Sequence, residues 1–499
     1  MKKSLPTASL AALLLVSLPL TATLTGCKGS SEEPEWTEPV EIVTLPELTI
    51  PEKPDERVYT DLTPYTDRLD GLFANTTPAP AEDFTYTVVG EGMPDAFVGT
   101  VTITGYTGSD SVVIIPDTIE GAPVTAIAEG AFAENTVMRA VSIPDSVTSI
   151  AKGAFKGCKG LTSMKTPVFT CQDAPYFGAL FGAETYEANG YTVPTGLSTL
   201  VISGTDVGSQ PISIPKATFY ACRNLEVVDL AGTVTEIGEF AFYGCQSLVY
   251  IGTAETVLTS VGRNAFTNCR ALLTMELPAT VETLGFAMLE GCGKLESLTL
   301  PFAGGHRVGY TPSEESEDTA ETTYLGYLFG SSDYTLTKGF LPASLISVTL
   351  LEGCGDVAPN AFFECSPLRE VHLPDGVSAI GRRAFYGCEG MIDMTLPDTV
   401  TSLGDDAFGG CLRLTSFHGG QGLKTLGVQA FMNCLSLKTV TLPTGVTSLP
   451  NSCFAGCISL ESLIADGVTS QGKQVFRHCD RLGAPWVTAP SSPSESSQN

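Results

Sequence analysis

The chain has 499 residues, of which 43% are hydrophobic and only 16% are charged, so it can bury a large core. Its 55 acidic and 27 basic residues give a formal net charge of −28, which phosphate backbones would repel, and this excludes nucleic-acid binding. Four histidines leave little scope for imidazole chemistry, and a single strongly apolar run, near the N-terminus, excludes a polytopic membrane protein.

Residues 1–26 are predicted to be an export signal. Two lysines precede an apolar stretch over residues 10–20 that is too short to span a bilayer. The segment ends in Leu-Thr-Gly-Cys27, which resembles the lipobox of bacterial lipoproteins. The resemblance implies cleavage before Cys27, acylation of that cysteine and attachment to a membrane through its lipid. The alternative is an ordinary signal peptide followed by an unrelated cysteine.

Residues 27–83 are predicted to be a lipidated cysteine followed by an acidic, proline-rich tether. Residues 28–83 contain fourteen acidic residues, four basic residues and eight prolines. A segment of low hydrophobicity and high net charge cannot bury enough surface to offset the entropy of ordering. A short helix over residues 59–73 is the alternative within it. At the other end, residues 484–499 form a low-complexity tail that is expected to be disordered.

Residues 131–483 are an internal repeat, because the motif Ala-Phe-x-x-Cys recurs every 23 residues with single departures of one. In one complete unit, Leu368, Val371 and Leu373 alternate as in a short strand. Residues 377–381 form a second apolar element that ends in a glycine turn, and residues 384–388 form a third. Single units cannot bury these residues, whereas stacked units share a continuous core. We therefore predict a repeat solenoid, mainly β, with short parallel strands.

The pattern L-x-x-V-x-L-P followed by I-G-x-x-A-F-x-x-C resembles the BspA-type leucine-rich repeats of bacterial surface proteins. The resemblance covers residues 84–483 and implies a leucine-rich-repeat fold. Residues 84–130 resemble the unit that precedes the first repeat in that family, so a β-rich N-terminal cap is expected there. The family is associated with attachment to host proteins and to other cells, and the resemblance implies that role here.

Two interruptions enlarge the coils at about residues 165–215 and 301–358. Each contains the motif Y-x-G-x-L-F-G, and the two copies lie 148 residues apart. The recurring Phe181 and Phe329 are expected to fold back into the core. Three tyrosines of the interruptions outside this motif are the candidate ligand contacts: Tyr186, Tyr310 and Tyr334. The second interruption also contains an acidic run at 314–321, which lacks the residue order of a defined calcium loop.

Eleven of the fifteen cysteines occupy one position of the repeat. A cysteine at a fixed core position behaves as a small hydrophobic residue, and side chains stacked in register disfavour disulfide geometry. We therefore predict buried free thiols. Cys171, Cys354 and Cys453 lie outside this phase and are the candidates for partial exposure.

The outward positions of the predicted strands are rich in serine and threonine, and Tyr250 is their only aromatic residue. His372 and His418 share one outward position two coils apart, which separates them by about 9–10 Å. Two imidazoles on one zinc ion need nitrogens about 2 Å from the metal. The sequence therefore predicts no metal and no cofactor, and these three residues count as further candidate ligand contacts.

No nucleophile elbow, zinc-protease, P-loop or dinucleotide motif is present, and flat coils are expected to offer faces rather than clefts. No catalytic residue and no enzymatic activity are predicted. The favoured function is a monomeric lipoprotein, exported and exposed on the bacterial cell envelope, whose rigid rod binds a protein on a host or neighbouring cell. The alternatives are a structural envelope spacer that binds nothing and an enzyme acting on envelope polymers.

Overall fold

The computed structural model describes residues 60–71, 73, 76–89, 99–204, 211–230, 232–307 and 322–483. They belong to the second of two compact units, residues 58–499, and the first unit, residues 1–57, lies wholly outside the described part. The predicted export signal, Cys27, Tyr310, the acidic run and the C-terminal tail also lie outside it. Among the described residues, no helix is long and apolar enough to cross a membrane.

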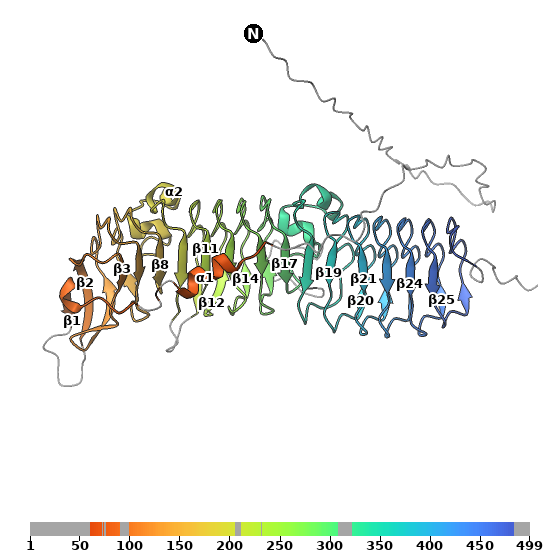
Figure 1. The fold of residues 1–499 in the computed structure, drawn as a ribbon, viewed down its shortest axis with the longest axis horizontal. Coiled ribbons are helices and arrows are strands. Elements are labelled where there is room, and N and C mark those ends of the chain that lie inside the picture. Colours follow the sequence, from red (N-terminus) through yellow and green to blue (C-terminus); the bar gives the residue numbers. More distant parts are fainter. Residues whose placement is uncertain are drawn as a thin grey trace, which may run out of the picture. The chain divides into compact units, whose positions relative to one another are not determined.

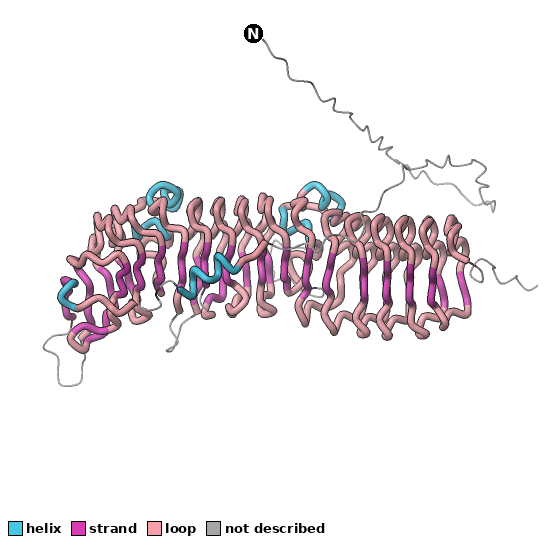
Figure 2. Tube along the Cα trace, in the orientation of Figure 1, coloured by secondary structure: helices cyan, strands magenta, loops and turns pink. Residues whose placement is uncertain are grey.

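The second unit is a stack of coils with about 23 residues each, and successive coils place their strands side by side (Figures 1 and 2). We call the longer line of parallel strands the first strand row, and its outward surface the strand face. Its strands are β3 Val112–Ile114, β6 Ala140–Ser142, β8 Ser163–Thr166, β9 Thr199–Ile202, β11 Val227–Leu230, β13 Tyr250–Gly252, β15 Thr274–Glu276, β17 Ser297–Leu300, β18 Ser347–Leu350, β19 Glu370–His372, β21 Asp393–Thr395, β23 Ser416–His418, β24 Thr439–Thr441 and β26 Ser462–Ile464.

A second strand row forms another side of the coils. Its strands are β5 Ala122–Ile127, β7 Ser149–Ile150, β10 Ile212–Ile214, β12 Val234–Ile237, β14 Ser260–Val261, β16 Thr283–Leu284, β20 Ala379–Ile380, β22 Ser402–Leu403, β25 Ser448–Leu449 and β27 Ser470–Gln471. At the N-terminal end, β1 Phe84–Val89 pairs antiparallel with β2 Thr100–Tyr106, and β4 Thr118–Ile119 pairs antiparallel with β5. Because β2 pairs in parallel with β5, this small sheet continues into the second row.

The helices are short and few in the described part of the chain. They are α1 Thr63–Gly71, η1 Ala81–Asp83, η2 Phe177–Phe181, η3 Tyr186–Ala188, α2 Asn189–Thr192, η4 Leu325–Phe329 and η5 Tyr334–Gly339, where η marks a 3-10 helix. The sequence predicts a flexible tether up to residue 83, whereas the structure places α1 and Ala79 against the solenoid. Contacts between α1 and both β9 and β11 hold the helix there.

The predicted phase of the repeat is confirmed by a ladder of phenylalanine rings inside the coils. Phe385 is fully buried, and its ring lies 5.1 Å from the ring of Phe362 and 5.0 Å from that of Phe408, nearly parallel to both. The same stacking recurs from Phe132 to Phe155 at 5.0 Å. Each coil therefore buries its phenylalanine against the two neighbouring coils and not within itself.

The glycine of the repeat has a different role from the predicted one. Gly381 was expected to permit a tight turn, but the left-handed backbone falls two residues later, at Arg383 with φ 54°. A Cβ atom on Gly381 would lie 2.4 Å from the backbone nitrogen of Pro359 in the preceding coil. The glycine is therefore required because adjacent coils approach too closely for a side chain.

Candidate functional site

Each enlarged coil is closed by its Y-x-G-x-L-F-G motif, which folds into a buried 3-10 helix. All five residues of η2 and all five residues of η4 are buried, so the prediction that Phe181 and Phe329 belong to the core is confirmed. Each helix ends at a glycine in the left-handed region, Gly182 with φ 89° and Gly330 with φ 91°. These positions favour glycine because other residues are strained there.

The motif also carries the hydrogen bonding of the solenoid across the enlarged coil. The amide of Phe155 in the coil before it donates to the carbonyl of Leu180, at 2.9 Å. The amide of Phe177 donates to the carbonyl of Thr218 in the coil after it, at 2.9 Å. In the second copy, Leu289 donates to Leu328 in the same way, at 2.8 Å. The insert therefore replaces one side of a regular coil without interrupting the stack.

Beyond the buried helix, each enlarged coil forms a projection that we call a knob. The first knob comprises residues 186–192, which are η3 and α2, and the second comprises residues 334–340, which are η5 and Phe340. Both knobs project from the same edge of the solenoid (Figures 1 and 2). The two projections are thus related by the duplication of the chain.

Buried polar groups hold the knobs in place. Asn189 is fully buried, and its side chain accepts a hydrogen bond from the amide of Gly178 and donates one to the carbonyl of Thr218. In the second knob, the equivalent position is the buried Thr337, whose hydroxyl donates to the carbonyl of Tyr334 at 2.7 Å. Buried hydrogen bonds are costly to break, so Asn189 ties the first knob to η2 and to the following coil, whereas Thr337 stiffens the second knob internally.

A charged cap and an ion pair add to the second knob. The carboxylate of Asp333 accepts hydrogen bonds from the amide and the hydroxyl of Thr335, and these bonds lower the pKa of Asp333. Lys338 pairs with Glu389 of a following coil at 2.9 Å, with both side chains largely exposed. An exposed pair contributes little to stability, about 0–1 kcal/mol. It does join the knob to the coils beside it.

The knobs expose apolar side chains. Tyr186 and Tyr191 are 41% and 79% exposed in the first knob, and Leu336 and Phe340 are 51% and 41% exposed in the second. Of the tyrosines predicted as contacts, Tyr186 is therefore at the surface, while Tyr334 is half-buried and packs edge-on against Phe363. Sequence reasoning did not select Tyr191, Leu336 or Phe340 as contacts. All three lie in the interruptions of the repeat, and the repeat pattern does not assign them to the core.

The three candidates on the strand face are spread along it. His372 and His418 are exposed, and β21 lies between their strands, with Thr395 paired beside His418. Tyr250 is half-buried, and burial raises its pKa. Within the described ranges, no group of three or more histidine, cysteine or acidic residues could hold a metal ion.

One cavity departs from the expectation of flat faces. It has a volume of about 540 Å³ and lies where β12, β14 and β16 meet the second enlarged coil. Glu236, Arg263, Phe286 and Tyr327 are among its lining residues, and the guanidinium of Arg263 lies 5.2 Å above the ring of Phe286. The hollow lies between the regular coils and the second enlarged coil, because residues of both line it.

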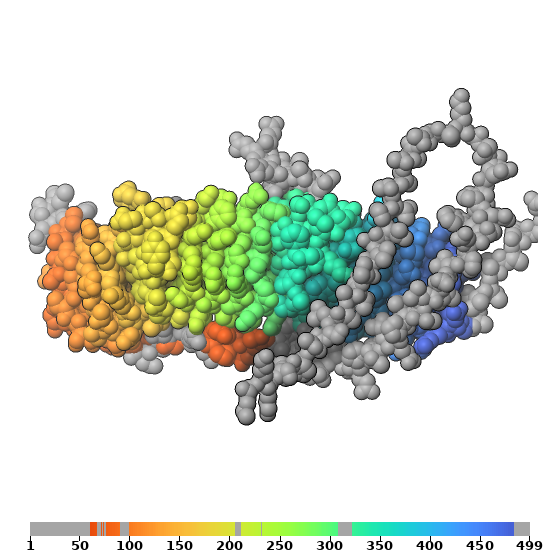
Figure 3. Space-filling model, turned by 90° about the horizontal axis from the view of Figure 1, so that it is seen from above, coloured from red at the N-terminus to blue at the C-terminus, as the bar shows by residue number. Residues whose placement is uncertain are grey.

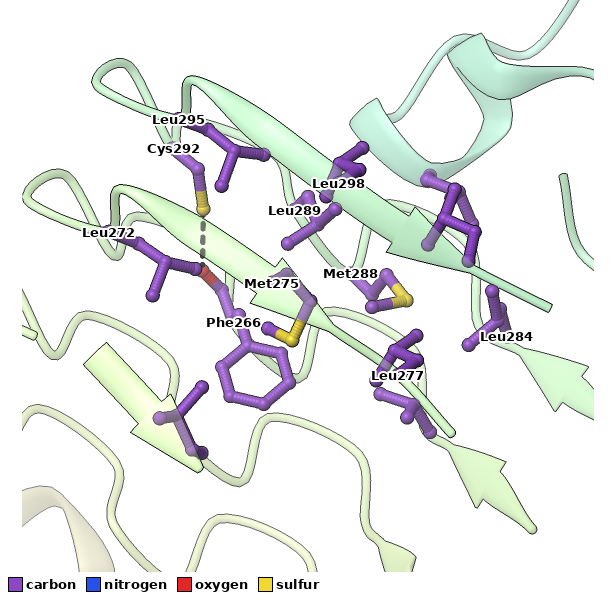
Figure 4. Packing of buried hydrophobic residues seen from close by; sticks show 14 of the residues in the cluster. Phe266, Leu272, Met275, Leu277, Leu284, Met288, Leu289, Cys292, Leu295 and Leu298 are labelled. Carbon is purple, nitrogen blue, oxygen red and sulfur yellow. Dashed lines mark hydrogen bonds between the residues drawn. The ribbon is translucent and has the colours of Figure 1, made fainter. Parts of the chain in front are cut away.

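The fourteen described cysteines are all free and buried. The expectation that Cys171, Cys354 and Cys453 are partly exposed is wrong, since their exposed fractions are 8%, 4% and 0%. Most thiols at the repeated position donate to the carbonyl of the core phenylalanine of the preceding coil, as Cys292 does to Phe266 at 3.3 Å (Figure 4), whereas Cys365 donates to Phe363 of its own coil. Burial raises their pKa values, that of Cys292 to about 12, so they are protonated and poor nucleophiles.

Stacked coils with short parallel strands define the chain as a leucine-rich-repeat solenoid. The profile of the BspA type leucine rich repeat region matches six copies, over residues 113–174, 209–305 and 340–483, which is more than half of the chain. The chain therefore belongs to the BspA-type leucine-rich-repeat family. Members of this family are bacterial cell-surface proteins, and leucine-rich-repeat proteins generally bind protein partners.

Several solved structures are similar to this chain at low identity. A leucine-rich repeat protein from Bacteroides ovatus is 22% identical, with 81% of this chain and 81% of that chain covered and a TM-score of 0.30. A leucine rich cell surface protein from Faecalibacterium prausnitzii is 22% identical over 78% of this chain and 95% of its own, with a TM-score of 0.30. The pneumococcal vaccine antigen PcpA is 21% identical over 80% and 88%, with a TM-score of 0.29. Among curated proteins, no sequence matches.

Proposed function

We propose that this protein is an exported lipoprotein, anchored to the bacterial cell envelope through Cys27, whose solenoid is displayed on the cell surface and binds a protein of a host or neighbouring cell. The lipobox-like segment before Cys27 supports the anchor. Membership of a family of cell-surface proteins supports the display.

The observation that carries the binding role is the pair of knobs. Exposed aromatic and large aliphatic residues are the groups that dominate the energy of protein interfaces. Here they gather on two projections whose backbones are held by buried hydrogen bonds, as at Asn189. A rigid projection loses little conformational entropy on binding, and a tyrosine provides a large contact area with few rotatable bonds. The knobs are therefore the best partner contacts on the described surface.

The anchor is tested by replacing Cys27 with serine. We expect the variant to leave the membrane fraction or to accumulate unprocessed, because acylation needs the thiol. Membrane-fraction blots and protease treatment of intact cells measure anchoring and display. Anchoring that is unchanged in the variant would contradict the lipoprotein assignment.

The binding role is tested with the soluble Cys27→Ser chain, immobilised and exposed to surface-protein extracts from bacteria and from animal cells. The knob variant carries Tyr191→Ala and Phe340→Ala. The matched control carries Val257→Ala and Ile458→Ala, which are 48% and 49% exposed outside the knobs. We expect the knob variant to weaken retention of a partner by about 30-fold, as for a hot spot of about 2 kcal/mol.

Retention by the control should match that of the parent chain. If no protein is retained by the parent chain from either extract, the structural-spacer alternative replaces the binding role. If the knob variant and the control retain a partner equally well, the contact lies elsewhere on the solenoid.

A further inference from the structure

The chain just before the cap is docked on the strand face. We call residues 60–71 and 76–80 the strap. At its start, the amide and the hydroxyl of Thr60 donate to the carboxylate of Glu296 at 3.1 and 2.8 Å, immediately before β17. In its middle, α1 contacts β11 and β9. At its end, the amide of Ala79 donates to the carbonyl of Ile114 in β3, at 2.8 Å.

The strap therefore runs against the order of the coils, from β17 back to β3. Figure 1 shows α1 lying across the first strand row near β11, and Figure 3 shows the same helix, in red, on one side of the stack. Locally, the helix begins at a capped turn, in which the carboxylate of Asp61 accepts a hydrogen bond from the amide of Thr63 at 2.9 Å. Leu62 and Tyr65 are half-buried, and Ala79 is buried.

The first outward position of the strands is buried or half-buried from β3 to β18, one strand beyond the place where the strap begins. Val227 is fully buried although it lies outside the core cluster, and Thr199, its partner in the neighbouring strand, is 3% exposed. The equivalent position is occupied by Glu370 in β19 and by Thr439 in β24, and both are exposed. Outward residues on β9 and β11 are thus covered, and those beyond β18 are largely open.

We propose that the strap fixes the exit of the N-terminal tether at the middle of the strand face, so that a solenoid anchored through Cys27 is held by its middle, with its two ends at equal mean distances from the membrane, instead of by its N-terminal end. The strand β17 is the eighth of fourteen in the first row, so Thr60, the first described residue, contacts the solenoid near its midpoint. Without the strap, the tether would begin at the cap, beside β1. This inference rests on the lipid anchor of the proposed function.

The strand face carries the point of attachment, and the strap occupies its first half. Both knobs project from an edge of the stack, so neither is covered by the strap (Figure 1). The fourteen strands at about 4.8 Å span about 60 Å. In an end-on arrangement the last coil would therefore stand about 60 Å farther from the membrane than the first, whereas side-on the two ends are equally distant.

Docking of the strap is tested first, in the full chain carrying Cys27→Ser, so that the result does not depend on lipidation. Thr60→Cys is combined with Glu296→Cys, whose side chains are in hydrogen-bond contact, and in a matched control with Glu461→Cys in the C-terminal coils. With a short bis-maleimide reagent we expect the thiols of the first pair to be cross-linked and those of the second pair to remain unlinked. The buried native thiols do not compete. Equal cross-linking of the two pairs would overturn the docking.

Orientation is tested with the lipidated chain in phosphatidylcholine vesicles that contain a trace of headgroup-labelled acceptor lipid. A donor dye is placed on Thr87→Cys at the first end or on Lys473→Cys at the last, both of which are exposed. We expect equal energy transfer from the two ends. Glu296→Lys removes the contact of Thr60 but leaves those of α1 and Ala79, so it should move the exit toward β11 and β9, raising the transfer from residue 87 and lowering that from residue 473.

Two outcomes separate the orientation from the anchor. A chain that fails to join the vesicles overturns the anchor and the orientation with it, while the cross-link still reports on the strap. A chain that joins the vesicles and cross-links, but transfers energy far better from residue 87 than from residue 473, overturns the orientation alone.

Discussion

Replacing Phe385 by alanine should destabilise the protein far more than the same replacement at Phe476. Phe385 is fully buried between two parallel rings at 5.1 and 5.0 Å, so its removal costs the transfer energy and leaves a cavity in three coils, about 3–5 kcal/mol. Phe476, in the last coil, is half-buried, and its ring lies 5.9 Å from that of Phe454. Replacing Phe476 by alanine therefore costs only about half of the transfer energy and creates little cavity, so we expect a loss of about 1–2 kcal/mol.

Guanidinium unfolding followed by circular dichroism measures the two losses. Because repeat arrays can unfold in segments, hydrogen exchange of the amide of Phe385, which donates to Ala407 at 2.8 Å, reports on the central coil directly. Phe340→Ala, at a side chain that is 41% exposed in the second knob, is the control and should cost less than about 1 kcal/mol. Equal losses at Phe385 and Phe476 would refute the stacked core with a less buried last coil.

The fourteen described cysteines should not react with a thiol reagent at pH 8 until the protein is unfolded, since all are buried, and a rapidly reacting thiol would contradict this. Burial raises the pKa of Cys158 and of Cys171 from 9.0 to about 11, so between pH 9 and pH 11 the unfolded chain holds fewer protons on these thiols than the folded chain does. The free energy of unfolding should therefore be steady below about pH 9 and fall above it. The fall should be less steep in Cys158→Ala, which lacks one of the two thiols. Replacing residues 308–321 by a short glycine linker should leave the melting temperature unchanged, because the amide of Gly305 donates to the carbonyl of Thr322 and keeps the ends together. A deletion that also removes Arg307 should lower it, since the guanidinium donates to the carbonyls of Gly353 and Ala279 at 2.7 Å.

The fold could be predicted from the sequence because each coil repeats one arrangement of apolar residues. An alternating strand, a glycine at a fixed place and a phenylalanine 23 residues from the next leave only a stack of coils that buries them all. The burial of Cys453 could also have been predicted, because it occupies the alanine position directly before Phe454. Its small side chain then fills the same buried place as Ala384 does in a regular coil.

The sequence offers a helix over residues 59–73 as an alternative, and α1 lies within that range, but the docking of the strap could not be predicted, because no periodic pattern describes it. Thr60 and Glu296 are 236 residues apart, and their contact consists of two hydrogen bonds at an exposed site. Composition indicated a flexible segment, since charge and proline are abundant there. A few polar contacts, on a strand face that also includes residues such as Val227, order the segment locally despite its composition. Nothing in the sequence around Thr60 or around Glu296 indicates that the two residues meet.

The exposure of the knob residues depends on a feature that is visible in the sequence, the residue that follows the core phenylalanine. The residue after the core phenylalanine is aromatic only in the two coils that follow each enlarged coil: Tyr220, Tyr243, Phe363 and Tyr386. Tyr220 and Tyr243 stack at 5.0 Å, and Tyr186 of the first knob packs edge-on against Tyr220 at 5.3 Å. Phe363 and Tyr386 stack at 5.3 Å beneath Tyr334 in the same way. Each knob is therefore supported by a short aromatic ladder from the regular coils, and Tyr334 is half-buried because it contacts this support, which leaves Leu336 and Phe340 as the exposed side chains of the second knob.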